Sequence, residues 1–193
     1  MAHPQDVLVL ARAAIDPKLS HDAMGEFHEY HSRVVSMPGV LSHTLWQSIA
    51  WADRCAVLTH FEDEAASIRV MEDMIDGGYL EKATAASMSV PNVKSFLPIV
   101  EVGGQVQEFT AGPVMSLSVQ VTPPGGLPER LEDLAYLAEV FQSLPGYRGF
   151  RLCRGVRVAD EVLSLMYWDS VQSFEGSMPK QPLNPVEVFR RLA

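Results

Sequence analysis

The chain has 193 residues, of which 47% are hydrophobic and 20% charged, the balance of an ordinary globular protein. Its 15 Lys and Arg residues against 24 Asp and Glu give a net charge of −9, with no basic block. Nucleic acids and anionic membranes are therefore excluded as partners, because both need a positive surface. With no signal-peptide pattern at the start and no apolar run near the ~20 residues of a membrane span, a cytoplasmic protein that handles a small molecule is expected.

The first half of the chain predicts strands and helices in the order β-α-β-β-α-β, which is the ferredoxin-like unit. Met37-Pro38-Gly39 predicts the turn after the first helix, because proline cannot continue a helix and glycine accepts unusual dihedral angles. Gly77-Gly78 ends the second helix. The predicted elements are strand 7–15, helix 19–35, hairpin strands 40–49 and 54–62, helix 63–75 and, after a polar stretch, strand 96–102.

The second half repeats this order after a linker with Gly and Pro at both edges, residues 103–113. Its predicted strands are 114–121, 147–156, 161–168 and 186–192, and its predicted helices are 127–141 and 170–178. The sequence therefore predicts two domains, residues 1–106 and 107–193, each one ferredoxin-like repeat.

A constant offset of 107 residues relates the two halves without a gap from Val7 to Met71. Gly39 recurs as Gly146 and Asp53 as Asp160, both at this offset. A sheet covered by helices on one face leaves its other face bare, and pairing two such sheets buries both. We therefore expect the α+β fold class, with two β-α-β-β-α-β repeats forming a fused, intrachain dimeric α+β barrel. Two units packed loosely through their helices are the alternative.

The end of the third strand of each repeat is followed by an acidic or small residue that opens the second helix. Tyr167-Trp168-Asp169-Ser170 has this pattern, and His60-Phe61-Glu62-Asp63 is its weaker counterpart. Together with the Pro-Gly turn and the element order, the chain resembles the antibiotic biosynthesis monooxygenase-like proteins of the dimeric α+β barrel superfamily, here as a tandem duplication. The resemblance implies an oxidoreductase, with members that oxidise aromatic substrates without a cofactor and others that degrade haem. Because single-unit members form dimers, it also implies a monomeric pseudo-dimer or a homodimer of such chains.

All six histidines lie in the first sixty residues, so any site that uses imidazole is expected in the first repeat. His28 and His31 lie one turn apart on the first helix, where the 107-residue offset gives Ala135 and Ala138. Two such imidazoles can serve as a general base with its orienting partner or as metal ligands. The other interpretation is that both bond to backbone carbonyls or to neighbouring carboxylates.

The hairpin carries two more histidines whose relative position depends on its register. A register that pairs Ile49 with Arg54 places His43 directly opposite His60 on one face, and a shift of one residue places them on opposite faces. No HxxxH or HxH spacing supports a metal, and none is expected. The candidate catalytic residues are His28, His31 and His60, and the candidate substrate-binding residues are Phe27, His43, Trp46 and Phe61.

The chain contains no nucleophile elbow, GxGxxG motif or P-loop, which disfavours hydrolase and nucleotide-binding classes. We expect a small-molecule oxygenase-like enzyme without a bound organic cofactor, in which His28, His31 or His60 deprotonates a phenolic substrate. A non-catalytic binder of a lipophilic small molecule is the first alternative, with the second repeat mainly completing the barrel. A haem-binding protein is the second, although the histidine that the haem-degrading members carry after the second helix is missing from Asp63 to Leu80.

Overall fold

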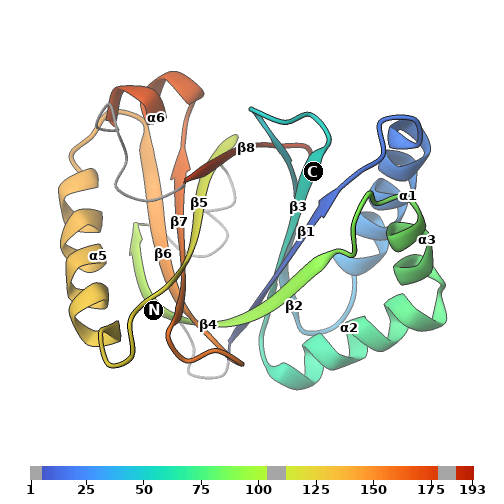
Figure 1. Ribbon diagram of the computed structural model, residues 1–193, viewed down its shortest axis with the longest axis horizontal. Coiled ribbons are helices and arrows are strands. Elements are labelled where there is room, and N and C mark those ends of the chain that lie inside the picture. The colour runs from blue at the N-terminus through green and yellow to red at the C-terminus, as the bar shows by residue number, and fades with distance from the viewer. Residues whose placement is uncertain (1–5, 104–111, 178–185) are drawn as a thin grey trace. The chain divides into compact units, whose positions relative to one another are not determined.

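The structure is a computed structural model that describes residues 6–103, 112–177 and 186–193, apart from the side chains of residues 20–24, 135 and 138 (Figure 1). The chain forms two compact units. One runs from Phe96 to Arg191, and the other ends at Ser95 and takes in Leu192 and Ala193. The predicted boundary between residues 106 and 107 lies outside the described residues. None of the described helices is long and apolar enough to span a membrane.

The unit that ends at Ser95 consists of a sheet with three helices on one face (Figure 1). Its strands pair antiparallel in the order β1-β3-β2, and Val9, Thr59 and His43 lie in one cross-strand row. The elements are β1 (Val7–Ala14), α1 (Ser20–Val34), β2 (Val40–Ser48), β3 (Arg54–Phe61), α2 (Glu64–Asp76) and α3 (Tyr79–Ala85). The sequence did not predict α3, which occupies part of the expected polar stretch. It follows Gly78, whose φ of +71° favours glycine.

The second repeat places its elements at the predicted offset. Each of β5 (Val114–Val121), α5 (Leu127–Phe141), β6 (Tyr147–Gly155) and β7 (Glu161–Trp168) begins and ends 107 residues after its counterpart in the first repeat. Helix α6 (Val171–Ser177) also begins at this offset, and the residues that follow it lie outside the described part of the chain. The repeat is thereby confirmed element by element.

The turn between the first helix and the second strand contains a glycine with a positive φ in both repeats. Gly39 has a φ of +84° and Gly146 a φ of +77°, in the left-handed region that favours glycine. A Cβ atom on Gly39 would lie 2.6 Å from the Cβ of Ala66 on α2, so the turn also packs closely against that helix. The Pro-Gly pattern in the sequence therefore reports both a backbone conformation and a contact.

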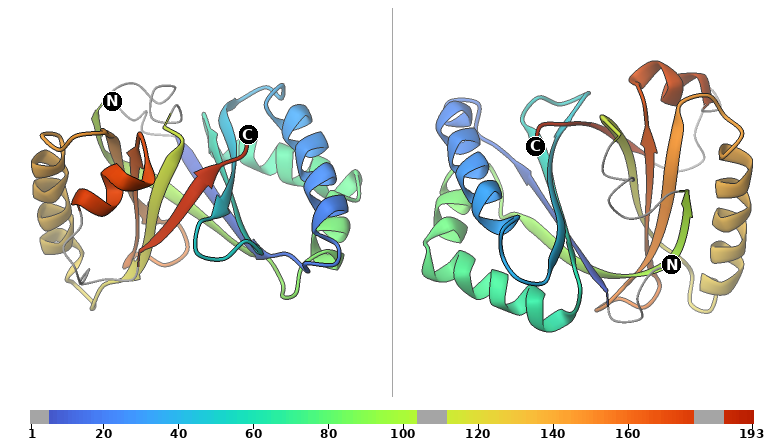
Figure 2. Two further views of the ribbon diagram at one scale, coloured as in Figure 1. Left: turned by 90° about the horizontal axis from the view of Figure 1, so that it is seen from above. Right: turned by 180° about the vertical axis from the view of Figure 1, so that it is seen from behind.

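In the unit from Phe96 to Arg191, five strands pair antiparallel in the order β8-β5-β7-β6-β4, with α5 along one face (Figure 2). Leu134 of α5 packs with Phe150, Leu152 and Val162 of the sheet. Strands β4 (Asn92–Gly103) and β8 (Glu187–Arg191) complete the element list.

Strand β4 of the first repeat and the last residues of the chain, after β8, pair outside the sheet of their own repeat. Phe96–Gly103 of β4 pairs with β6 of the second repeat. After β8, the backbone of Leu192 and Ala193 exchanges hydrogen bonds with Leu45 on β2 of the first repeat. The α+β class and the two ferredoxin-like repeats are confirmed, and these pairings between the repeats are the ones expected of a fused α+β barrel.

The predicted register of the first hairpin is wrong by one residue. His43 pairs with Thr59, and His60 pairs with Ser42, next to an irregularity between Val40 and Ser42. Because successive side chains of a strand alternate between faces, His43 and His60 lie on opposite faces of the sheet. The loop length alone did not determine this shift.

Candidate functional site

A cavity of about 330 Å³ lies in the first repeat, between the β1-β3-β2 sheet and the helices. It is of the size that small-molecule sites have in proteins. Alternate residues of β3 form the centre of its floor, and the adjacent strands contribute Val9, Ala11 and Leu45. The helices close it with mainly apolar side chains, among them Phe27, Val70, Met71, Met74 and Leu80.

The same space in the second repeat is filled by larger side chains. At the 107-residue offset, His43 corresponds to Phe150 and Thr59 to Met166. Phe150 is fully buried in the cluster beneath α5, and Met166 packs against that cluster. His43 and Thr59, which line the cavity of the first repeat, therefore correspond to apolar residues in the second repeat.

His43 is a buried polar group on the cavity wall, whose lining also includes Arg12. Its Nδ1 lies 2.8 Å from the Thr59 hydroxyl, which fixes the ring, and either atom can donate according to the imidazole tautomer. The ring centroid of His31 lies 5.1 Å from that of His43. Burial, together with the charge that a protonated His31 adds, lowers the pKa of His43 to about 3. The imidazole is therefore neutral in the empty cavity at physiological pH.

Tyr30 brings a second polar group to the same cavity from α1. It is buried, its ring is 6.1 Å from that of His43 in an edge-on arrangement, and it packs on Tyr79 with ring centroids 4.8 Å apart. Burial, and to a lesser degree the nearby Asp73 carboxylate, raises the pKa of Tyr30 to about 12. Tyr30 is therefore a neutral phenol that can donate a hydrogen bond.

Three of the residues expected to bind substrate, Phe27, His43 and Phe61, line the cavity together. The fourth, Trp46, is fully buried, and its Nε1 donates a hydrogen bond to the Thr44 hydroxyl. Its side chain points away from the cavity, because successive side chains of a strand alternate between the two faces of the sheet, and His43 and Leu45 point into the cavity.

The three candidate catalytic histidines lie in three different environments. His28 is exposed on α1. His31 is half-buried beside His43 but is not among the cavity-lining residues. His60 is fully buried on the other face of β3, with its Nε2 3.4 Å from the Asp6 carboxylate. The structure thus brings His31 to His43 and separates both from His60, and the catalytic roles stay a prediction.

Sequence reasoning missed Tyr30 and Thr59 as cavity residues. The comparison of the two repeats did contain a signal for Thr59, because its counterpart is the larger, apolar Met166. A threonine at this position leaves space beside the sheet and offers a hydroxyl for hydrogen bonding. Tyr30 gave no such signal, because its counterpart Leu137 is 38% exposed and its burial depends on the unpredicted helix α3.

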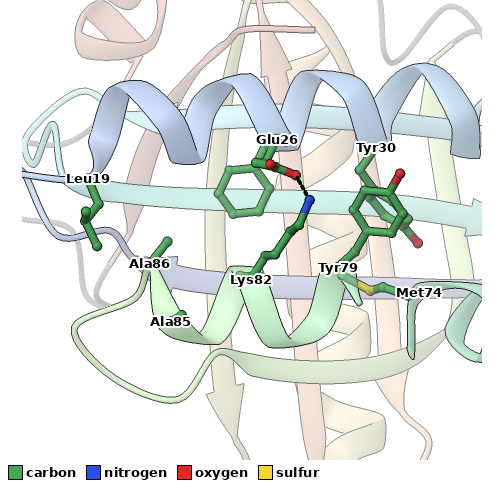
Figure 3. Close-up of a pocket in the computed structure, with 10 residues that line it drawn as sticks. Leu19, Glu26, Tyr30, Met74, Tyr79, Lys82, Ala85 and Ala86 are labelled. Atoms are coloured by element: carbon green, nitrogen blue, oxygen red, sulfur yellow. Dashed lines mark hydrogen bonds and ion pairs between the residues drawn. The ribbon is translucent and has the colours of Figure 1, made fainter. Parts of the chain in front are cut away.

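A groove of about 250 Å³ runs between α1 and α3 beside the cavity (Figure 3). The ammonium group of Lys82 lies 2.7 Å from the Glu26 carboxylate and links the two helices across it. The cavity and the groove share four lining residues, Phe27, Tyr30, Met74 and Ala83. Among the described residues, no group of three or more His, Cys, Asp or Glu is placed to hold a metal ion.

No family model matches the chain. Among curated proteins, it is 29% identical over 64 residues to the heme oxygenase (mycobilin-producing) of two Mycobacterium tuberculosis strains. The match takes in 33% of this chain and 61% of the length of those relatives.

Solved structures match over nearly the whole chain. A protein from Fusobacterium nucleatum proposed to be a monooxygenase has a TM-score of 0.77 at 8% identity, covering 99% of this chain and 94% of that one. An anthrone oxidase-like protein has a TM-score of 0.77 at 12% identity, covering 99% and 92%. A ferredoxin-fold protein related to antibiotic biosynthesis monooxygenases, from Listeria monocytogenes, has a TM-score of 0.58 at 10% identity, covering 99% and 96%. The chain therefore has the fold of the antibiotic biosynthesis monooxygenase-like proteins, with its ferredoxin-like unit present twice in one polypeptide.

Proposed function

We propose that this protein oxidises a flat, largely apolar phenolic or carbonyl-bearing aromatic molecule with dioxygen, in the cavity of the first repeat and without an organic cofactor. The observation that carries the proposal is the cavity itself: apolar walls around one buried, neutral imidazole held by Thr59. Apolar pockets with a few fixed polar groups are typical of sites that bind and orient small molecules. The names of the structural neighbours that match the whole chain agree with this reaction class.

His43 is the base that the geometry favours over His28 and His60, because it alone among these three lines the cavity. An imidazole with a pKa of about 3 is a weak base in the empty cavity. An anion forming beside it raises that pKa, because opposite charges a few ångströms apart in a buried site stabilise each other. The pair formed by substrate oxyanion and imidazolium would thus exist only while substrate is bound.

For an anthrone-type substrate, the steps balance without any further reagent. A C–H bond of the methylene carbon breaks, its proton passes to the imidazole, and the resulting enolate transfers one electron to dioxygen. Recombination forms a C–O bond, and the imidazolium returns its proton to the peroxide oxygen, which regenerates the base. Loss of water then breaks the second C–H bond and the O–O bond, leaving a ketone. Neutral Tyr30 can donate a hydrogen bond to the developing oxyanion.

Anthrone turnover under air tests the proposal. Purified protein treated with chelator should consume one O2 per anthrone and yield anthraquinone, followed with an oxygen electrode and by mass spectrometry against a protein-free blank. His43→Phe, which installs the residue of the second repeat, should lower the rate at least tenfold. His28→Phe is the matched control, because His28 is exposed, and should leave the rate unchanged. Binding without turnover of any anthrone or naphthol tested would instead identify a lipophilic-ligand binder.

Haem as the ligand is the second candidate, favoured by the 29% identity to the mycobacterial heme oxygenase. A neutral imidazole is the form that ligates haem iron, and His43 is neutral. Titration of the protein with haemin, followed by the Soret band, decides this candidate. A stoichiometric shift that His43→Phe abolishes would support haem, and a titration identical to that of free haemin would dismiss it.

A further inference from the structure

We propose that the groove between α1 and α3 is the outer half of the same binding site and accommodates an apolar extension of the ligand, such as an alkyl chain. The inference rests on the proposed function in one respect, that the cavity holds the ligand's ring system. It adds a second subsite and predicts that ligands longer than the cavity bind more tightly.

The first support is continuity between the two spaces. Phe27 and Tyr30 of α1, Met74 of α2 and Ala83 of α3 line both the cavity and the groove. Figure 3 shows Tyr30 and Tyr79 side by side between the two helices, with Met74 next to them. A ligand seated against His43 therefore meets the groove directly past the Tyr30 ring.

The second support is the chemistry of the groove walls. Beyond the shared residues, Leu19, Ala85 and Ala86 are apolar. The charged groups of the lining, Glu26 and Lys82, satisfy each other in an ion pair whose side chains are 40% and 54% exposed. A neutral chain suits such a groove, since an anionic or cationic one would have to compete with that ion pair.

The third support is that α3, which forms one wall of the groove, belongs to the repeat that carries the cavity. In the described part of the second repeat, no helix lies between α6 and β8. Helix α3 has no fully buried residue, yet the chain after it is fixed to β1, where the Met88 amide donates to the Ala14 carbonyl over 2.7 Å. The helix is therefore held at a distance from α1 that leaves the groove open, in the repeat that also carries the cavity.

A series of 4-alkylphenols from 4-ethylphenol to 4-octylphenol tests the proposal by calorimetric titration of the full chain. Burial of one methylene group stabilises a complex by an amount equivalent to about fourfold in Kd. We expect Kd to fall by about this factor per added methylene in the wild type. In Ala85→Trp, which fills the groove from an exposed position of α3, the gain should stop in the longer members while 4-ethylphenol keeps its wild-type Kd.

Ala65→Trp is the matched control, because Ala65 is an exposed alanine of α2 that lines neither space, and it should behave as the wild type. If 4-ethylphenol binds but longer chains gain nothing, or gain equally in Ala85→Trp, the groove proposal is wrong and the cavity proposal survives. If no member of the series binds the wild type, the cavity proposal and the groove proposal are both wrong.

Discussion

At the scale of single residues, the replacement of Phe150 and Met166 by His43 and Thr59 distinguishes the two repeats most clearly. The backbone frame is the same, since both pairs lie at corresponding positions of corresponding strands. A cavity in a protein core costs free energy, because the side chains that line it lose contacts. The first repeat therefore carries a cost in stability that a bound ligand would reduce.

His43→Phe combined with Thr59→Met should therefore raise stability while it removes binding. The double change installs the two residues of the second repeat, fills part of the apolar cavity and replaces both partners of a buried hydrogen bond, which favours the folded state by about 1–2 kcal/mol. Chemical denaturation of the unliganded protein measures this. Met166→Thr in the second repeat reverses one of the two changes and should destabilise. A clear loss of stability in the double variant would mean that the space around residue 43 is already filled.

The pKa of His43 predicts a specific pH dependence of stability. Because burial lowers this pKa to about 3 in the folded protein, while an unfolded histidine titrates near ~6.5, the unfolded state binds the proton first. The stability is therefore complete above pH ~6.5 and falls as the pH drops toward 3.

Between pH 7 and pH 5, the wild type should lose about 2 kcal/mol more stability than His43→Phe does. Urea titrations at the two pH values measure the difference. The exposed His28 offers the control, since His28→Gln should retain the wild-type loss. Equal losses in the wild type and His43→Phe would show that His43 titrates normally.

At the scale of elements, each long helix is held by a few residues on its sheet-facing side. Leu134 of α5 is 5% exposed and contacts the buried cluster, whereas Leu137 on the same helix is 38% exposed. Val34 of α1 is likewise buried, while the next residue, Val35, is 46% exposed. Helical periodicity places the centre of a buried stripe better than its edge.

Leu134→Ala should accordingly destabilise the unit from Phe96 to Arg191 by about 2–5 kcal/mol, through lost transfer free energy and the cavity left behind. Leu137→Ala on the same helix should cost less than ~1 kcal/mol, because its side chain is partly exposed already. Guanidinium titrations of both variants give the comparison. Equal effects of the two substitutions would indicate that α5 packs with a different face.

At the scale of the whole molecule, the pairing of β4 with the second repeat makes the structural units differ from the sequence repeats. Phe96–Gly103 is the edge partner of β6, although it belongs to the first repeat in sequence. A fragment of residues 107–193 therefore lacks one strand of its sheet and leaves β6 with an unpaired edge, which promotes aggregation.

A fragment that begins at residue 92 should fold, and one that begins at residue 107 should not. Circular dichroism melting and two-dimensional NMR of residues 92–193 and 107–193 test this difference. A cooperative melt of the shorter fragment as a monomer would instead support the predicted boundary at residue 106.

The sequence by itself determined the element order, the 107-residue repeat and the α+β class, because these depend on local patterns: the spacing of apolar residues, and the Pro-Gly turn whose glycine must adopt a positive φ. It also indicated the first repeat as the one that carries the imidazoles. Only the tertiary structure decided which of those imidazoles meet. From Gln47 and Cys55 onward, the hairpin strands pair one residue away from the register expected from the loop length, and His60 therefore lies on the face opposite His43. The loop length without the turn type does not fix this register. The cavity, likewise, exists because Thr59, Tyr30 and helix α3 come together from distant parts of the chain, and no pattern within any one of them encodes the space between them.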